Sequence, residues 1–332
     1  MIRYGVLGFG LHGEKRLAPA FADAKSSKLV GIWRRNLDKA QANARKYGIE
    51  HVFTSPEDLC ASPAVDAVFV TSPDAFHRRD TLLALNYGKP VLCEKPLAMN
   101  VAEVEDMLTA ARNANVLFGV AQPFRYNRSV QLIRDWVAAG RIGKPAFASA
   151  FYCNQSGQSL RAWIHDPTVA RGGTMGDVGI HCLDALRFVL QDEVAAVTTI
   201  AHRDAQSGAV ETSAASTIDF RQGTIASVMV SSRTEYRTLV EVVGESGVIR
   251  SENCFSTLAP VDVQLLLSGK VIDSQQVSNA DAFCRLLDAF SAAIEGHGSY
   301  GASGDDGLKN QRALDAAYAS WHSGRKEIII EP

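Results

Sequence analysis

The stretch Ile2-Arg3-Tyr4-Gly5-Val6-Leu7-Gly8-Phe9-Gly10-Leu11-His12-Gly13 decides how the first part of this chain folds. A short apolar run ends in Gly-x-Gly-x-x-Gly, a helix-compatible segment covers 14–24, and a second apolar run covers 28–33. Strand, glycine turn, helix and strand in this order form the context of a dinucleotide-binding fingerprint. The alternative is a plain glycine-rich turn.

Each glycine of this pattern has an expected task. Gly8 allows the turn off the strand, Gly10 lets a pyrophosphate approach the backbone, and Gly13 allows close packing of helix on strand. The start of the helix offers N–H groups to phosphate. The expected cofactor-binding residues here are Gly8, Phe9, Gly10, Leu11, His12 and Gly13.

The end of the second apolar run predicts the cofactor type. An NAD site usually carries a carboxylate there, for the ribose 2′-hydroxyl, but this chain has Trp33-Arg34-Arg35-Asn36. Guanidinium groups match a 2′-phosphate in charge and geometry. We therefore expect NADP to be preferred over NAD, with Arg34 and Arg35 as binding residues; the alternative is two solvated arginines.

The rest of the first 121 residues alternates between strand-like and helix-like segments. Strands are expected at 51–53, 65–71, 91–93 and 116–120, and helices at 37–47, 76–87 and 101–113. This alternation predicts a doubly wound parallel sheet, an α/β Rossmann domain spanning 1–121.

Ligands bind such sheets beyond the carboxyl ends of the strands, so the residues that follow each strand are candidates. These further cofactor candidates are Thr71, Ser72, Pro73, His77, Glu94, Lys95 and Gln122. Lys95 is the main one, because a lysine at the end of a central strand is held where a nicotinamide ring is expected. His77 is either a surface histidine at a helix start or a neighbour of the ribose and phosphate.

The pattern changes after the expected boundary, and 122–332 is assigned to a second, α+β domain. A helix is expected at 127–139, followed by strands at 146–153, 194–202, 212–220, 224–232 and 238–243, with a hairpin turn at Gln222-Gly223. Strands with few helices between them predict a largely antiparallel sheet with one open face.

A second informative segment, Arg171 to Arg187, lies within this domain. A glycine-rich loop opens a helix on which Asp177, His181 and Asp184 share one face. A carboxylate beside an imidazole can position a histidine for proton transfer. The alternative is a histidine that satisfies a buried carboxylate.

Composition excludes several classes of function. The net charge is −2 over 332 residues, and no basic stripe indicates a nucleic-acid or membrane partner. The chain enters a strand at once and has no long apolar run, so neither a signal peptide nor a membrane span is expected. Six scattered cysteines without metal-ligand spacing predict reduced thiols, a cytoplasmic location and no metal site.

With these segments in hand, the chain resembles the Gfo/Idh/MocA family of sugar and inositol oxidoreductases. The resemblance covers nearly the whole chain. It rests on the motifs Gly-Phe-Gly-Leu-His-Gly (8–13), Glu-Lys-Pro (94–96), Phe-Arg-Tyr (124–126), Gly-Gly-Thr-Met-Gly-Asp-Val-Gly-Ile-His (172–181), Gly-Glu-Ser-Gly (244–247) and Ser-Gly-Asp-Asp-Gly-Leu (303–308).

The resemblance implies roles for particular residues. Lys95 is implied to contact the nicotinamide ribose and the substrate, Asp177 to hold the substrate, and His181 to be the general acid/base. Trp163 is implied to lie near the nicotinamide, with Ile164 where the family often has arginine. Association through the open face of the second-domain sheet is also implied, as a homodimer or homotetramer.

The leading hypothesis is an NAD(P)-dependent dehydrogenase or reductase that acts on a secondary alcohol of a sugar or polyol. In it, His181 takes the hydroxyl proton, Lys95 stabilises the developing alkoxide and Asp177 orients the pair. The candidate substrate-binding residues are Lys95, Arg125, Tyr126, Tyr152, Arg161, His165, Asp177 and His181.

Two alternatives remain open at this point. One is a glycosidase-type enzyme that retains NAD and oxidises a sugar carbon transiently. The other is a dinucleotide-binding sensor without turnover, which would not need Lys95, Asp177 and His181 together.

Overall fold

The computed structural model describes residues 1–155, 162–204 and 209–330, which form two compact units. The first unit consists of Met1–Gln122 and Phe283–Leu308, and the second of Pro123–Ala282 and Lys309–Pro332. The sequence analysis placed the boundary one residue earlier and assigned all of 122–332 to one domain. The return of 283–308 depends on long-range contacts, such as the 2.9 Å hydrogen bond from the Tyr300 hydroxyl to the Val120 carbonyl.

The first unit is built on a parallel sheet in the order β3-β2-β1-β4-β5-β6. This order is that of a dinucleotide-binding Rossmann fold, and it confirms the predicted doubly wound sheet. Its elements are β1 (Ile2–Leu7), η1 (Gly13–Leu17), α1 (Ala18–Asp23), β2 (Ser27–Trp33), α2 (Leu37–Tyr47), β3 (His51–Val52), α3 (Pro56–Ala61), β4 (Ala67–Val70), η2 (Asp74–Phe76), α4 (His77–Asn86), β5 (Val91–Glu94), α5 (Val101–Ala114), β6 (Phe118–Ala121) and α8 (Ala282–Ile294), the last beginning one residue before the unit boundary.

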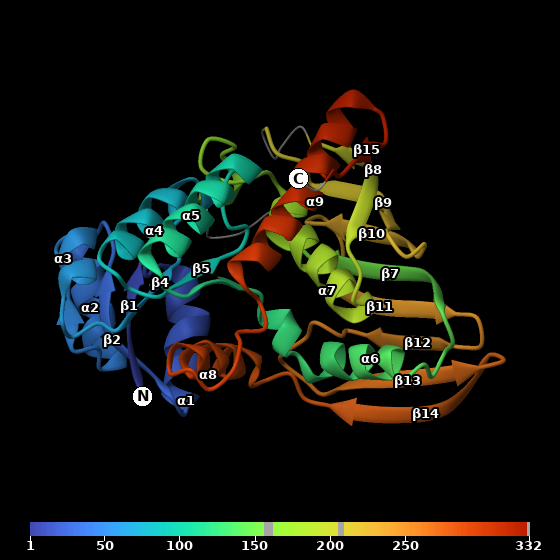
Figure 1. Cartoon of the computed structure of the whole chain (residues 1–332), viewed down its shortest axis with the longest axis horizontal. Helices are drawn as coiled ribbons and strands as arrows, with labels where there is room; N and C mark the ends of the chain where they lie inside the picture. Colours follow the sequence, from blue (N-terminus) through green and yellow to red (C-terminus); the bar gives the residue numbers. More distant parts are fainter. Residues whose placement is uncertain (156–161, 205–208, 331–332) are drawn as a thin grey trace. The chain divides into compact units, whose positions relative to one another are not determined.

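Helices cover both faces of this sheet (Figure 1). Successive β1 residues point to opposite faces: the ring of Tyr4 packs on Phe21 of α1, and its hydroxyl is 2.8 Å from the Ser291 hydroxyl of α8. A Cβ at the next residue, Gly5, would lie 2.6 Å from Leu59 of α3. Burial on both faces explains why the parallel strands read as continuous apolar runs.

Local sequence signals start and end helices of the first unit. The Asn36 side chain accepts a hydrogen bond from Lys39 N to begin α2, and Gly48 ends it with φ +66°. Ser55 caps α3 in the same way, with Pro56 in its first turn.

The second unit is built on a nine-stranded sheet in the order β14-β13-β12-β11-β7-β10-β9-β8-β15. Only the β7–β10 pair is parallel among the described pairings, which confirms the predicted largely antiparallel sheet. Its elements are η3 (Pro123–Tyr126), α6 (Arg128–Ala138), β7 (Pro145–Cys153), η5 (Ala162–His165), η6 (Met175–Gly179), α7 (Ile180–Leu190), β8 (Val194–His202), β9 (Ser213–Phe220), β10 (Ile225–Ser231), β11 (Arg237–Gly244), β12 (Val248–Glu252), β13 (Val261–Leu267), β14 (Lys270–Val277), α9 (Gly304–Ser323) and β15 (Glu327–Ile328).

The core of the second unit lies on one face of this sheet, under α6, α7 and α9 (Figure 1). Inward residues of the strands, such as Val228 and Val240, pack there with Ile133, Leu183 and Leu314 of the three helices. The opposite face carries exposed apolar side chains, which agrees with the predicted open face. These are Phe147, Ile200, Ile225 and Met229.

Sequence analysis assigned no element after residue 243, and the structure adds β12 to β15, α8 and α9. One sequence signal for the hairpin β13–β14 was available, the dipeptide Ser268-Gly269. These two residues join the strands with positive φ values of 49° and 74°. Such a two-residue connection is typical of a β-hairpin.

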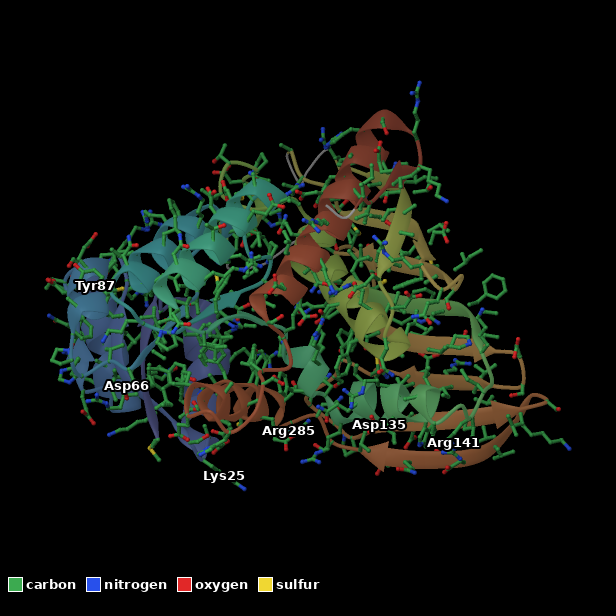
Figure 2. All side chains as sticks on the ribbon, viewed as in Figure 1. Lys25, Asp66, Tyr87, Asp135, Arg141 and Arg285 are labelled. Carbon is green, nitrogen blue, oxygen red and sulfur yellow. The ribbon has the colours of Figure 1, made fainter. Side chains whose placement is uncertain are left out.

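Other predictions concern the surface and the thiols. No described helix has the length and apolarity that a membrane span requires, and no metal-ligating cluster occurs among the described residues. All six cysteines are free. Polar side chains such as Asp66 and Arg141 lie at the periphery of their own units (Figure 2).

Candidate active site

The glycine loop follows β1 at the carboxyl edge of the first sheet, and its own geometry requires glycine at Gly8 and Gly13. Gly8 has φ +86°, and a Cβ there would lie 2.6 Å from the backbone nitrogen of Ser72. A Cβ at Gly13 would lie 2.7 Å from the Phe9 ring. At Gly10 the nearest atom is 3.6 Å away, so this glycine faces open space that a side chain would fill.

Phe9 keeps its side chain inside the first unit, which leaves only its backbone for a cofactor. Its ring is buried and meets Tyr47 edge-on at 6.2 Å. The N–H groups of Gly8 and Phe9 both donate to the Trp33 carbonyl, at 3.0 and 3.1 Å. The half-exposed Leu11 and His12 begin the helix that follows.

The two arginines after β2 have different surroundings. Arg34 is 18% exposed, and its Nη1 donates to Glu14 Oε1 at 3.2 Å. The same carboxylate oxygen accepts a hydrogen bond from Asn43 Nδ2. Arg35 is exposed. Of the two predicted phosphate-binding arginines, Arg34 is therefore paired with a carboxylate, whereas Arg35 faces solvent.

The loop after β4 supports the glycine loop. The Thr71 hydroxyl donates to the carbonyls of Leu7 and Gly8, at 3.2 and 3.1 Å, so this side chain holds backbone. The buried Ser72 hydroxyl makes no hydrogen bond within the part of the chain that is described. Pro73 is half-buried and leads into η2.

His77 is not the surface histidine that one of the two alternatives predicted. It is 1% exposed, so it is not a surface histidine. Both ring nitrogens lie within 2.8 Å of backbone carbonyl oxygens, those of Ser72 and Pro96, so neither nitrogen is available to a ribose or phosphate. Its position under two loops comes from tertiary packing.

Glu94 and Lys95 end β5 at the same edge as the glycine loop. Glu94 Oε1 lies 2.9 Å from His12 Nε2, an ion-pair distance when the imidazole is protonated. Burial raises the pKa of Glu94, but His12, Lys95 and His77 outweigh it and lower the pKa below its ordinary value. Glu94 is therefore a carboxylate. Lys95 is half-buried, and its peptide bond to Pro96 is cis.

The residues present fit a dinucleotide. The open space at Gly10 suits a pyrophosphate, and the unpartnered Ser72 hydroxyl is a hydrogen-bonding group for a polar ligand. The Glu94 carboxylate suits a ribose hydroxyl, and Gln122, which is almost fully buried, closes the end of β6. All of these lie at one edge of one sheet.

In the second unit, the segment 172–181 is shaped by a buried carboxylate that sequence analysis missed. Glu211, 2% exposed, accepts hydrogen bonds from the N–H groups of Gly173 and Met175, at 2.9 and 2.8 Å. It also accepts one from the Tyr318 hydroxyl at 2.7 Å. Glu211 did not stand out in the sequence, and Tyr318 belonged to a stretch, Ala317-Tyr318-Ala319-Ser320, that contributed to the resemblance but was given no site role.

The glycines of this segment are required by the same contacts. A Cβ at Gly172 would overlap the Tyr318 hydroxyl, and a Cβ at Gly173 would overlap the Glu211 carbonyl. The backbone then forms the π-helical turn η6, which leads into α7 and carries Asp177 one turn before His181. Asp177 is half-exposed, whereas its immediate neighbours Gly176 and Val178 are buried.

His181 is 7% exposed and lies among aromatic rings. Its ring centroid is 4.4 Å from that of Phe124, which stacks on Phe255 at 4.6 Å. Tyr152 lies 6.1 Å from Phe124 and 6.3 Å from Tyr236. The second unit thus brings His181 and the candidate Tyr152 into one aromatic cluster.

Arg125 has a different role from the predicted one of binding substrate. Its guanidinium is buried and pairs with Asp184, with Nη2 2.7 Å from Oδ1 and Nε 3.0 Å from both carboxylate oxygens. Asn310 Nδ2 donates to the same carboxylate at 2.7 Å. Asp184 therefore belongs to a buried network that joins η3, α7 and α9.

The remaining candidates lie as follows. Tyr126, Trp163 and His165 are half-buried, and Arg161 lies outside the described residues.

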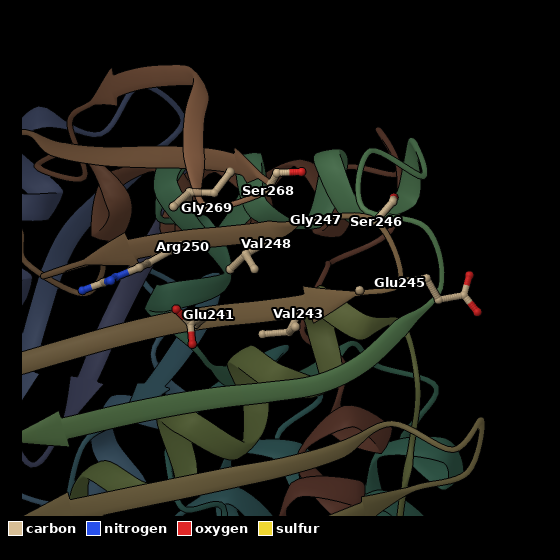
Figure 3. A pocket seen from close by; sticks show the side chains of 11 residues that line it. Glu241, Val243, Glu245, Ser246, Gly247, Val248, Arg250, Ser268 and Gly269 are labelled. Carbon is tan, nitrogen blue, oxygen red and sulfur yellow. The ribbon is translucent and has the colours of Figure 1, made fainter.

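A pocket of about 430 Å³ occurs over β11, β12 and β13 (Figure 3). Glu241 and Arg250 face it from paired positions of β11 and β12. None of the candidate residues lines it. The pocket therefore belongs to the open face of the sheet and lies apart from the candidate residues.

Comparisons with known proteins bear on both units. A model described as "Oxidoreductase family, NAD-binding Rossmann fold" matches residues 2–122, and one described as "GFO/IDH/MocA C-terminal domain" matches residues 130–250. The 1,5-anhydro-D-fructose reductase of Ensifer adhaerens is 33% identical over 310 residues, 93% of this chain and 92% of that protein. The D-glucoside 3-dehydrogenase of Escherichia coli is 27% identical, over 98% and 97% of the two chains.

Solved structures share the whole fold. The aldose-aldose oxidoreductase from Caulobacter crescentus, complexed with glycerol, has a TM-score of 0.91 and 25% identity over 99% of each chain. Levoglucosan dehydrogenase, in complex with NADH and levoglucosan, has a TM-score of 0.87 over 99% of this chain and all of that one, at 21% identity. At 21% identity, the likeness to levoglucosan dehydrogenase shows a shared fold alone.

Proposed function

We propose that this chain, which belongs to the GFO/IDH/MocA family of oxidoreductases, transfers a hydride between NAD(P) and a secondary alcohol of a sugar or polyol. The observation that carries the proposal is the placement of Lys95 directly after β5, at the sheet edge that also holds the glycine loop. We further propose that Gly8 to Gly13, Ser72, Glu94 and Gln122 hold the dinucleotide.

The proposed proton chemistry uses three residues of the chain. Bound nicotinamide supplies the hydride acceptor or donor. His181 takes the hydroxyl proton, and the Lys95 ammonium stabilises the negative charge that develops on the substrate oxygen. Asp177 orients the substrate. Phe124 packs on the His181 ring and restricts its orientation.

The relatives support a carbohydrate substrate. They are named for 1,5-anhydro-D-fructose, a D-glucoside and inositol, all rich in secondary alcohol or carbonyl groups. Tyr126, Tyr152, Trp163 and His165 are proposed substrate or nicotinamide neighbours. Arg125 is not proposed, because its guanidinium is already paired with Asp184.

Two broader proposals accompany this function. The exposed apolar side chains on the open sheet face support a homodimer or homotetramer formed through that face. Six free cysteines, four of them buried, support a reducing compartment such as the cytoplasm.

The first test separates binding from turnover. Fluorescence titration with NADPH and NADH should show saturable binding of at least one, followed by NADPH-dependent reduction of 1,5-anhydro-D-fructose or NADP-dependent oxidation of D-glucosides. A dinucleotide that co-purifies and never exchanges would favour the retained-cofactor alternative. Saturable binding without turnover on any sugar or polyol would favour a sensor.

The second test addresses Lys95. The substitution Lys95→Met should lower kcat by about a hundredfold or more, because it removes a charge that acts on the reacting oxygen, while the Kd for NAD(P)H changes little. Lys28→Met, at an exposed lysine of the same unit, is the matched control. Unchanged turnover in the Lys95 variant would sink the catalytic assignment.

A further inference from the structure

His77, the first residue of α4, bridges two loops at the carboxyl edge of the first sheet. Its Nδ1 lies 2.8 Å from the Pro96 carbonyl oxygen, and its Nε2 lies 2.7 Å from the Ser72 carbonyl oxygen. Ser72 follows β4, and Pro96 follows β5, the neighbouring parallel strand. The imidazole therefore connects the loop after β4 to the loop that carries Lys95.

The two partners decide the protonation state of this ring. A carbonyl oxygen only accepts hydrogen bonds, so each ring nitrogen must donate to make its contact. A neutral imidazole has one N–H and would leave its other nitrogen facing a carbonyl. The two distances are those of good hydrogen bonds, so the geometry requires the imidazolium.

The charged groups around the ring are consistent with a buried cation. Burial lowers the pKa of His77, but contact with Cys93 of β5, then Asp74 of η2 and the Pro96 carbonyl, raises it to about 10. The Glu94 carboxylate also interacts with this cation. The direction of this pKa shift agrees with the imidazolium that the two carbonyl partners require.

We propose that His77 is a positioning residue for Lys95, which fixes the loop that begins at Glu94 by holding the Pro96 carbonyl. The role in turnover rests on the proposed function, because it acts through Lys95. The double hydrogen bond itself does not rest on it.

The protonation state is tested first, on the wild-type protein without any substrate. In protein labelled with ¹⁵N on histidine rings, one histidine should show two protonated ring nitrogens at pH 8, and this signal should be absent from the spectrum of His77→Asn. A His77 signal typical of a neutral tautomer at pH 8 would overturn the proposal, whatever the enzyme's activity.

Two variants then separate the two hydrogen bonds. Asn at position 77 can place a donor near the site of Nδ1, toward Pro96, whereas Gln can place one near the site of Nε2, toward Ser72. We expect kcat to fall in the order wild type, His77→Asn, His77→Gln, with a loss of about tenfold or more in the Gln variant, because small displacements of a reacting group are costly. The Kd for NAD(P)H should change less than about threefold.

Several outcomes would contradict this positioning role. They are equal kcat values in both variants and the wild type, or a loss that follows thermal stability and disappears at lower temperature. His51→Gln, at an exposed histidine of the same unit, is the control. If Lys95→Met retains turnover while His77 proves doubly protonated, the catalytic assignment of Lys95 fails, and with it the role of His77 in turnover, whereas the double hydrogen bond of His77 remains.

The pH dependence of stability has a definite sign. Folding raises the pKa of His77 from the ordinary 6.5 to about 10, so the folded state holds the proton more tightly. The resulting stabilisation of the folded state is complete below pH 6.5, decreases as the pH rises from 6.5 to about 10, and is absent above the folded pKa. The difference in unfolding free energy between wild type and His77→Asn should therefore shrink as pH rises; a difference that grows would contradict the imidazolium.

Discussion

At the scale of single residues, the structure changes the meaning of the Arg34-Arg35 pair. Both arginines looked equivalent in the sequence, yet Arg34 donates to Glu14 and Arg35 is exposed. A guanidinium that already has a carboxylate partner gives less to a phosphate. Any preference for NADP is therefore expected to depend more on Arg35.

This difference can be measured as cofactor selectivity. Arg35→Ser should raise the Kd for NADPH about tenfold and leave the Kd for NADH nearly unchanged, because a charge-assisted hydrogen bond is worth about 1.5 kcal/mol or more. Arg45→Ser, at an exposed position of α2, is the control. Equal losses for both cofactors would show that Arg35 does not read the 2′-phosphate.

At the scale of elements, η6 and α7 depend on Glu211 more than on their own sequence. Three glycines occur within 172–176, two in the loop before η6 and one inside η6, so local propensity does not favour a helix there. Glu211 instead accepts hydrogen bonds from the Gly173 and Met175 N–H groups. Burial, and next the contact with Glu211, raise the pKa of Tyr318. A distant side chain thus defines where this helix begins.

Removing that carboxylate should destabilise the second unit. Glu211→Ala leaves two buried donors, Met175 N–H and the Tyr318 hydroxyl, and the part-buried Gly173 N–H without their acceptor, so we expect a loss of about 3 kcal/mol in the free energy of unfolding, measured by urea denaturation. Glu211→Gln should lose less, since one oxygen remains. Glu235→Ala, on an exposed loop, is the matched control. If Glu211→Ala unfolds at the same urea concentration as Glu235→Ala, Glu211 does not hold this element.

At the scale of the whole molecule, the open face of the nine-stranded sheet is the feature without an intramolecular role. Phe147 and Ile225 are paired across β7 and β10 and are 58% and 46% exposed. Ile200 and Met229 continue the apolar surface on β8 and β10. A flat apolar face of this kind suits a second copy of the same sheet.

The proposed assembly can be tested in solution. Wild-type protein should sediment as a dimer or tetramer. The double substitution Phe147→Lys with Ile225→Lys should shift it to a smaller species, because it places two like charges on neighbouring strands in the face that would be buried. Leu258→Lys, at a 90% exposed leucine outside the strands, is the control. A monomeric wild type would remove the proposal.

Most local elements could be predicted before the structure. Helix α2 has the predicted limits, with Asn36 and Gly48 as its caps, and β8 covers the predicted residues 194–202. The glycine loop was recognisable because its constraints arise close to the loop. Gly8 has a positive φ and lies against the backbone after β4, and Gly13 lies against the ring of Phe9, four residues earlier.

What the sequence by itself determined is the alternation of elements, the parallel sheet, the glycine loop at its edge and the position of Lys95 after a strand, since period and capping are local properties. Only the tertiary structure decided the partners of buried polar groups. Arg125 meets Asp184, Glu211 meets Gly173, and His77 meets Pro96, and no local pattern specifies these pairs. A buried polar atom must find a partner, and in a folded chain that partner comes from wherever packing brings one within about 3 Å.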